Sequence, residues 1–173
     1  MSFSMYDVSV SVFRQYLAAL SGVLAKAEAH VASGALAEAD VMGVRLYEDM
    51  QPFTFQIMQA VSHGAGSVHN LRGETFERPT GLETLAGCKA AVDKAVAYLD
   101  SVAPADVPND PDAPVSLKFP GREMRFTARD YILTFVYGNF FFHCTTAYDI
   151  LRMKGVPVGK RDFLGAAKMT VVA

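Results

Sequence analysis

The segment YILTFVYGNFFFHCTTAYDILRMK, from Tyr131 to Lys154, predicts the helix around which the rest of the chain is organised. Its apolar positions recur at helical spacing and form one face: Ile132, Phe135, Val136, Ile150 and Leu151. Asn139 and His143 are four residues apart, so a helix places them on one side. Because an unpaired buried polar group costs about 1–3 kcal/mol, this pair is expected to have polar partners elsewhere in the chain.

Three further segments predict long helices, at Met5–Ser33, Gln51–Leu71 and Gly81–Val102, from apolar residues spaced by three and four. Alternating apolar residues in Val115–Thr127, interrupted by a Pro-Gly pair, predict a small β-hairpin. We therefore expect one all-α domain over residues 1–173, a four-helix bundle with a small hairpin before helix four.

The connecting segments carry weaker signals. A short helical turn is expected over Glu38–Val44, whereas the prolines and aspartates of Pro104–Pro114 argue against regular structure. The Gly-rich tail, Val156–Ala173, is expected to fold over one end of the bundle.

Composition excludes several function classes. A net charge of −2 gives no electrostatic footprint for nucleic acid or an anionic membrane. We find no apolar run of the roughly 18 residues needed to span a bilayer and no signal peptide, and expect a cytoplasmic protein. Cys88 and Cys144 are far apart in the sequence, and we expect both to be reduced thiols in or near the core.

The strongest candidate for chemistry is a pair of histidines on two helices, His63 and His143. Helical bundles build cofactor and metal sites from side chains on facing helices, and imidazole is the commonest metal ligand. Gln56 lies on the same polar strip as His63, and Asn139 lies beside His143. One hypothesis is a pocket for a small molecule or a divalent metal, lined by these four residues. The other is a non-catalytic interaction or stress-related protein, in which they form a structural polar network.

Other candidates are weaker. Cys144 adjoins His143, but neighbouring helical residues point about 100° apart, which disfavours a nucleophile–base pair. Lys160 and Arg161 could bind a carboxylate or phosphate. The aromatic run of Tyr137 and Phe140–Phe142 covers more than one helix face, so the tail or a second protomer is expected to bury part of it, and a homodimer is predicted.

Several blocks resemble an uncharacterised bacterial family of unknown function that is grouped with the DinB/YfiT-like bundles. They are the opening SMYDVSVSVFRQYLAALSGVLAKAEAH and the blocks LYEDMQPFTFQIMQAVSH (46–63), NFFFHCTTAYDILR (139–152) and GVPVGKRDFLG (155–165). The resemblance implies an up-down-down-up four-helix bundle that is often dimeric.

Many members of that wider group bind a divalent metal, such as zinc or nickel, through one histidine on helix two and an HxxxH pair on helix four. By position, His63 corresponds to the first of these histidines and His143 to the first of the pair. The second histidine of the pair corresponds to Ala147, which cannot be a ligand. Metal-dependent members include thiol transferases and hydrolases or isomerases, and the resemblance selects none of these activities for this chain.

Overall fold

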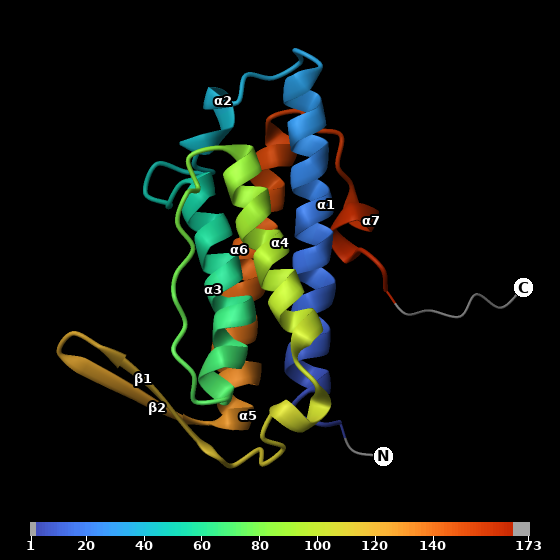
Figure 1. The fold of residues 1–173 in the computed structure, drawn as a ribbon. Coiled ribbons are helices and arrows are strands. Elements are labelled where there is room, and N and C mark those ends of the chain that lie inside the picture. Colours follow the sequence, from blue (N-terminus) through green and yellow to red (C-terminus); the bar gives the residue numbers. More distant parts are fainter. Residues whose placement is uncertain (1–2, 168–173) are drawn as a thin grey trace, which may run out of the picture.

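The computed structural model describes residues 3–167, and within them four long helices form an up-down-down-up bundle (Figure 1). In that view α1 (Val12–Ala32) ascends, α3 (Phe53–Leu71) and α4 (Leu85–Ser101) both descend, and α6 (Tyr137–Met153) ascends again. The all-α bundle predicted from the sequence is confirmed, together with the hairpin before its last helix.

The first helix begins in a π-helical segment, η1 (Asp7–Ser11), which continues directly into α1. By length and composition Asp7–Ala32 is apolar enough to cross a membrane, so the expectation that no apolar run is long enough was wrong. Core helices of soluble proteins pass the same test, and here the apolar side chains of α1 contribute to the core between the helices. The short α2 (Ala39–Met42) lies where the sequence predicts a helical turn.

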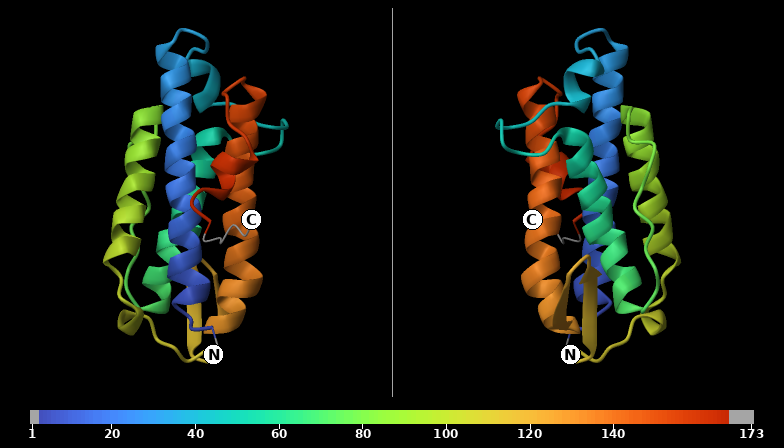
Figure 2. Two further views of the ribbon diagram at one scale, coloured as in Figure 1. Left: turned by 90° about the vertical axis from the view of Figure 1, so that its right-hand side faces the viewer. Right: turned by 90° about the vertical axis from the view of Figure 1, so that its left-hand side faces the viewer.

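The connection between α3 and α4 is a long crossover, residues 72–84, which we call the strap. Because α3 and α4 run in the same direction, the strap returns along the length of the bundle (Figures 1 and 2). The predicted start of α4 at Gly81 was four residues too early, since Gly81 has a φ of 73°. Thr84 caps the helix instead, its hydroxyl accepting a hydrogen bond from the Gly87 amide at 3.0 Å.

The segment between α4 and α6 contains a 3₁₀ turn, η2 (Pro104–Asp106), contrary to the expectation of no regular structure there. The hairpin pairs β1 (Pro114–Phe119) with β2 (Arg122–Thr127) in antiparallel register, as predicted. It leads through α5 (Ala128–Asp130) and a π-helical segment, η3 (Tyr131–Val136), into α6 without interruption.

The tail packs along the side of the bundle rather than over its end, so that expectation was wrong. α7 (Lys160–Leu164) lies against α1 and α6 (Figure 2). Phe163 is the anchor, with its ring 5.6 Å from Tyr16 of α1 and 5.8 Å from Tyr148 of α6. The last part of the tail prediction, residues 168–173, lies outside the described residues.

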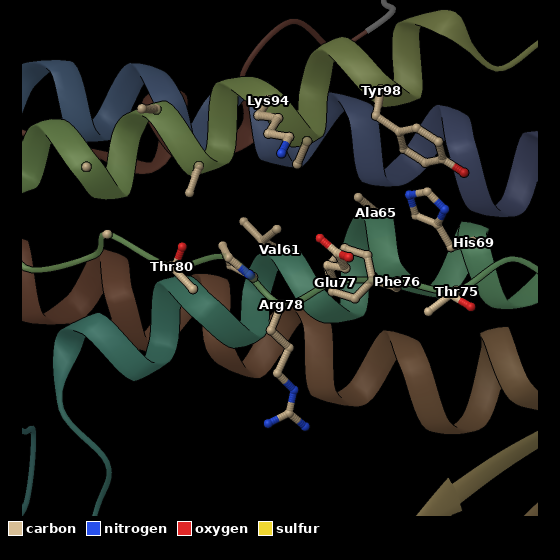
Figure 3. A pocket seen from close by; sticks show the side chains of 16 residues that line it. Val61, Ala65, His69, Thr75, Phe76, Glu77, Arg78, Thr80, Lys94 and Tyr98 are labelled. Carbon is tan, nitrogen blue, oxygen red and sulfur yellow. The ribbon is translucent and has the colours of Figure 1, made fainter.

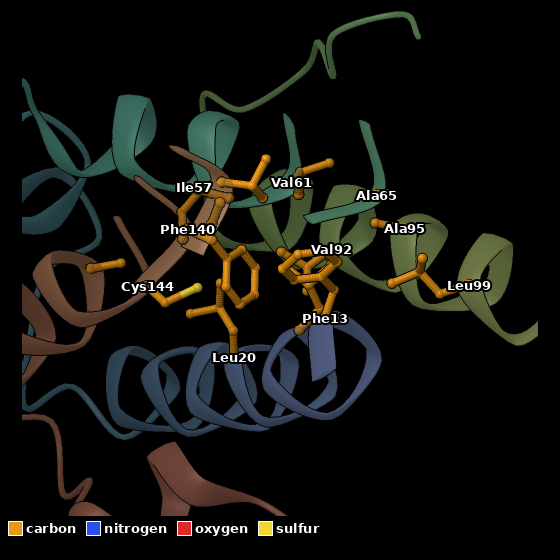
Figure 4. Close-up of a cluster of buried hydrophobic side chains, with 14 of the residues drawn as sticks. Phe13, Leu20, Ile57, Val61, Ala65, Val92, Ala95, Leu99, Phe140 and Cys144 are labelled. Carbon is orange, nitrogen blue, oxygen red and sulfur yellow. The ribbon is translucent and has the colours of Figure 1, made fainter. Parts of the chain in front are cut away.

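In the core, aromatic side chains of α1 and α6 meet over a glycine of α3. Phe13 and Phe140 pack edge to face with ring centroids 4.9 Å apart (Figure 4). A Cβ atom at Gly64 would lie 2.9 Å from Leu17 and 3.0 Å from Phe140, which is closer than a side chain allows. Glycine at position 64 therefore lets both helices approach α3 next to His63.

Candidate functional site

His143 is held in one orientation by a hydrogen-bonded chain between α3 and α6. Its Nδ1 lies 2.7 Å from Oε1 of Gln56, and the amide nitrogen of Gln56 donates to the Gln51 carbonyl at 2.8 Å. Because the amide oxygen can only accept, Nδ1 of His143 must carry the proton and Nε2 keeps its lone pair. His143 is 8% exposed and Gln56 is 1% exposed, so both ends of this bond are removed from water.

His63 lies beside His143, as the sequence predicts. Their rings are stacked, with centroids 5.7 Å apart and an interplanar angle of 7°. His63 is half-buried, and among residues 3–167 it makes ring contacts, to His143 and Phe135, but no hydrogen bond. Phe55 and Phe142 contact the His143 ring at 6.0 and 5.2 Å, so the histidine pair, His63 and His143, is surrounded by aromatic rings.

Both imidazoles are neutral at physiological pH. Burial, the neighbouring His143 and the positive charge of Arg78 lower the pKa of His63 from 6.5 to about 4. Burial alone lowers the pKa of His143 to about 4. Arg78 belongs to the strap, and Figure 3 shows its side chain extending away from α4. The strap therefore supplies a positive charge to the electrostatic environment of His63.

Asn139 does not join this network, although the sequence predicts that it orients the histidines. Its amide nitrogen donates to the Phe135 carbonyl of its own helix at 2.8 Å. The four predicted pocket residues therefore separate into three that lie together, Gln56, His63 and His143, and one that bonds to its own backbone.

The residues present do not fit the metal that the resemblance implies. A metal site of the implied kind needs three protein ligands, and the histidine pair supplies only two. Ala147, the third position of the pattern, is 0% exposed and has only a methyl group. Over the part of the chain that the structure describes, no group of three or more His, Cys, Asp or Glu side chains is placed to hold a metal.

Both cysteines are buried and unbridged, which agrees with the prediction of core thiols. Burial, reinforced by Glu38 and Glu83, raises the pKa of Cys88 to about 12, and burial raises the pKa of Cys144 as well. A nucleophilic role for Cys144 is therefore disfavoured by its environment as well as by its position.

The aromatic run on α6 is covered mainly from within the chain. Phe140 lies in the core, Tyr137 donates a hydrogen bond to the Val8 carbonyl at 2.6 Å, and Phe141 packs on Tyr16. Phe142 is the exception, at 53% exposed. It lies at the solvent edge of the histidine pair, and the homodimer stays a prediction.

Sequence reasoning missed a cavity of about 710 Å³ between α3, α4 and the strap (Figure 3). Small apolar side chains form much of its wall, and polar groups from α4 and the strap stand at its rim. The alanines and Gly87 of α4 suggested tight packing of helix on helix in the sequence. Only the path of the strap, which the sequence pattern does not specify, leaves the space open.

Residues 5–164 match the family described as "Domain of unknown function (DUF1993)". The chain belongs to this family. A solved structure described as a DinB family member protein from Shewanella denitrificans matches this DUF1993 chain with a TM-score of 0.81 and 28% sequence identity. The match covers 96% of this chain and 95% of that one, which confirms the DinB-like bundle implied by the resemblance. None of the curated proteins matches the chain.

Proposed function

We propose that the protein binds a small molecule, without chemical transformation, at the histidine pair between α3 and α6. The observation that carries this proposal is the contrast within the pair. Gln56 fixes the orientation of His143, whereas half-buried His63 has no hydrogen-bond partner among the described residues. A polar group left without a partner beside aromatic rings is typical of a ligand-binding site.

The surroundings restrict the chemistry of the ligand. A neutral imidazole accepts a hydrogen bond through its lone pair, so the ligand must offer an N–H or O–H donor or bring a polar atom to the ring N–H. The rings of Phe55, Phe135 and Phe142 favour a flat apolar body. The charge of Arg78 disfavours a cation. We therefore expect a small planar molecule that is neutral or anionic.

The pKa values favour binding over acid–base catalysis. A general base is most effective when its pKa lies near the working pH, and these imidazoles have pKa values of about 4. At neutral pH both rings are weak bases, and almost none of either is in the cationic form that a general acid requires. A neutral hydrogen-bonding group, with one ring N–H and one lone pair, remains the role that fits each ring.

Histidine NMR with four small probes tests the proposal. Phenol, benzoate and indole should shift the ring resonances of His63 and His143, whereas the cation N-methylpyridinium should not. His63→Gln should weaken the response to the three binding probes, and His30→Gln, on a distant turn of α1, should leave it unchanged. A response to phenol and benzoate that survives in both His63→Gln and His143→Gln would place their binding elsewhere and overturn the proposal.

The alternative function is a non-catalytic interaction protein in which the histidines are structural. The chain of hydrogen bonds from Gln51 through Gln56 to His143 favours it, because this chain ties the start of α3 to α6. It predicts that His143→Ala lowers the free energy of unfolding by about 1–3 kcal/mol, with no probe response lost. Urea unfolding and the NMR titration on the same variant separate the two functions.

A further inference from the structure

The cavity between α3, α4 and the strap is a second candidate binding site, separate from the histidine pair. Its volume of about 710 Å³ lies within the usual range for small-molecule sites. Its apolar wall consists of short side chains from both helices, which leave space that larger residues would fill: Val61, Ala65, Ala90, Ala91 and Ala95. Such a surface accepts an apolar group without having to rearrange.

Packing at the start of the strap holds the cavity in place. His69 of α3 stacks on Tyr98 of α4 with ring centroids 3.9 Å apart, and its Nδ1 lies 2.9 Å from a carboxylate oxygen of Glu74. Phe76 lies directly over Gly66, where a Cβ atom would be only 2.8 Å from the ring. The strap is therefore anchored to both helices at one end of the cavity.

Two opposite charges face the cavity without pairing. Lys94 extends from α4 and Glu77 stands on the strap across from it, with Val61 behind them (Figure 3). Within residues 3–167 neither side chain forms an ion pair or a hydrogen bond. Lys94 and Glu77 are both exposed to solvent. Nearby, Lys89 pairs with Asp93 at 2.6 Å and Arg72 with Glu74 at 2.9 Å. Arg78 also lines the cavity, but its side chain extends away from Lys94 (Figure 3).

We propose that this cavity binds a small α-amino acid with an apolar side chain. The ligand carboxylate pairs with the ammonium group of Lys94, and the ligand ammonium group pairs with the carboxylate of Glu77. The apolar side chain rests on the alanine wall of the two helices. A ligand with only one of these charges pairs with either Lys94 or Glu77 and leaves the other side chain without an oppositely charged partner.

Calorimetric titration with three probes of one shape tests this assignment. L-Phenylalanine carries both charges, 3-phenylpropanoate only the carboxylate, and 2-phenylethylamine only the ammonium group. Since a charge-assisted hydrogen bond corresponds to roughly a tenfold change in affinity or more, phenylalanine should bind at least about tenfold more tightly than either analogue.

Variants then assign each contact. Lys94→Met and Glu77→Gln should each weaken phenylalanine binding about tenfold, and Lys94→Met should leave 2-phenylethylamine unaffected. Lys89→Met is the matched control, because Lys89 lies on the same helix but pairs with Asp93 outside the cavity. The exchange Lys94→Glu with Glu77→Lys should recover binding with the ligand reversed.

Three results would overturn the assignment. They are equal affinity for phenylalanine and 3-phenylpropanoate, equal loss in Lys89→Met and Lys94→Met, and no heat of binding for any of the three probes. His63→Gln should not change the affinity for phenylalanine. This variant therefore separates the cavity from the proposed site at the histidine pair.

Discussion

α3 packs against two neighbours in different ways. Against α6, which runs antiparallel to it, the contact is close, and the buried amide of Gln56 is hydrogen-bonded to His143 and Gln51. Against α4, which runs parallel to it, short side chains and the strap leave a cavity with the opposite charges of Lys94 and Glu77 at its rim. We call these contacts the α3–α6 seam and the α3–α4 seam.

The difference shows how packing decides whether a polar group has a structural or a binding role. In a tight seam, an unpaired polar group loses its water and gains nothing, so it has to find a protein partner. Beside a cavity, a charged group keeps its water and can stay unpaired at little cost. Groups available to a ligand are therefore expected along the α3–α4 seam and at His63, the least enclosed part of the α3–α6 seam.

The largest predicted effect is a loss of stability in acid, caused by the two histidines of the α3–α6 seam. Both histidines have a pKa of about 4 in the folded protein, against 6.5 as the ordinary value. Below pH 6.5 the unfolded chain takes up protons that the folded protein does not, so the free energy of unfolding falls between pH 6.5 and 4 and the pair adds no further loss below 4. Allowing for solvent screening at half-buried His63, we expect a loss of roughly 4 kcal/mol.

Urea unfolding at about pH 7 and about pH 4 measures this loss. Carboxylates also titrate over this range, so the informative quantity is the difference from the double variant His63→Gln and His143→Gln. That variant should lose roughly 4 kcal/mol less than the natural chain over the same interval. An equal loss in both proteins would mean that the two imidazoles are not held neutral by the fold.

Ala147→His tests whether the α3–α6 seam has room for the missing third histidine. The position is fully buried, so an imidazole must displace core side chains and lies without a hydrogen-bond partner. We expect a loss of about 3 kcal/mol, from overpacking and desolvation together. Thr145→His, exposed on the same helix, should change stability by less than about 0.5 kcal/mol. Stoichiometric zinc or nickel that restores Ala147→His to the stability of the natural chain would show that a metal centre fits after all.

The sequence predicts the α3–α6 seam well, because its evidence is local. The spacing of the apolar residues identifies both helices, and the polar residues within those stripes identify Gln56, His63 and His143. The pattern could not show that Asn139 bonds to the Phe135 carbonyl, since residues four apart on a helix can satisfy one another as easily as a neighbouring helix. It also could not show that the two rings are stacked.

The α3–α4 seam was not predictable in the same way. Its alanines indicate close packing of helices, yet they line a cavity whose remaining wall is formed by the strap. The path of the strap depends on contacts between residues distant in sequence, such as the stacking of His69 on Tyr98. Lys94 and Glu77 look like ordinary surface charges in the sequence, and only their placement on facing walls distinguishes them.

Gln56→Leu should have an intermediate effect on stability. Leucine nearly preserves the volume but leaves Nδ1 of His143 and the Gln51 carbonyl without partners, so we expect a loss of about 2 kcal/mol. Gln59→Leu, on the half-buried part of the same strip, should change stability by less than about 0.5 kcal/mol.

Nitrogen NMR should also show His143 losing its preference for the tautomer with a proton on Nδ1 when Gln56 is replaced. If Gln56→Leu is as stable as the natural chain and keeps that tautomer, the hydrogen-bonded chain neither stabilises the α3–α6 seam nor fixes the tautomer of His143.

The smallest effect on stability is expected from Gly66→Ala. Gly64→Ala is the comparison, because the two glycines lie on the same helix and face different seams. Alanine favours a helix over glycine by about 1 kcal/mol at either position. At Gly64 the new methyl group meets Leu17 and Phe140, which are fully buried and cannot yield, so we expect a net loss of about 1–2 kcal/mol.

At Gly66 the new methyl group meets the ring of Phe76, which stands on the half-exposed strap and can move away. The gain in helix propensity and the cost of displacing the Phe76 ring should nearly cancel. The free energy of unfolding should therefore change by less than about 0.5 kcal/mol. The displaced strap should still carry Glu77 away from Lys94 and weaken phenylalanine binding by several-fold. If Gly66→Ala instead costs as much stability as Gly64→Ala, the strap is as rigid as the core, and the distinction between the seams does not hold.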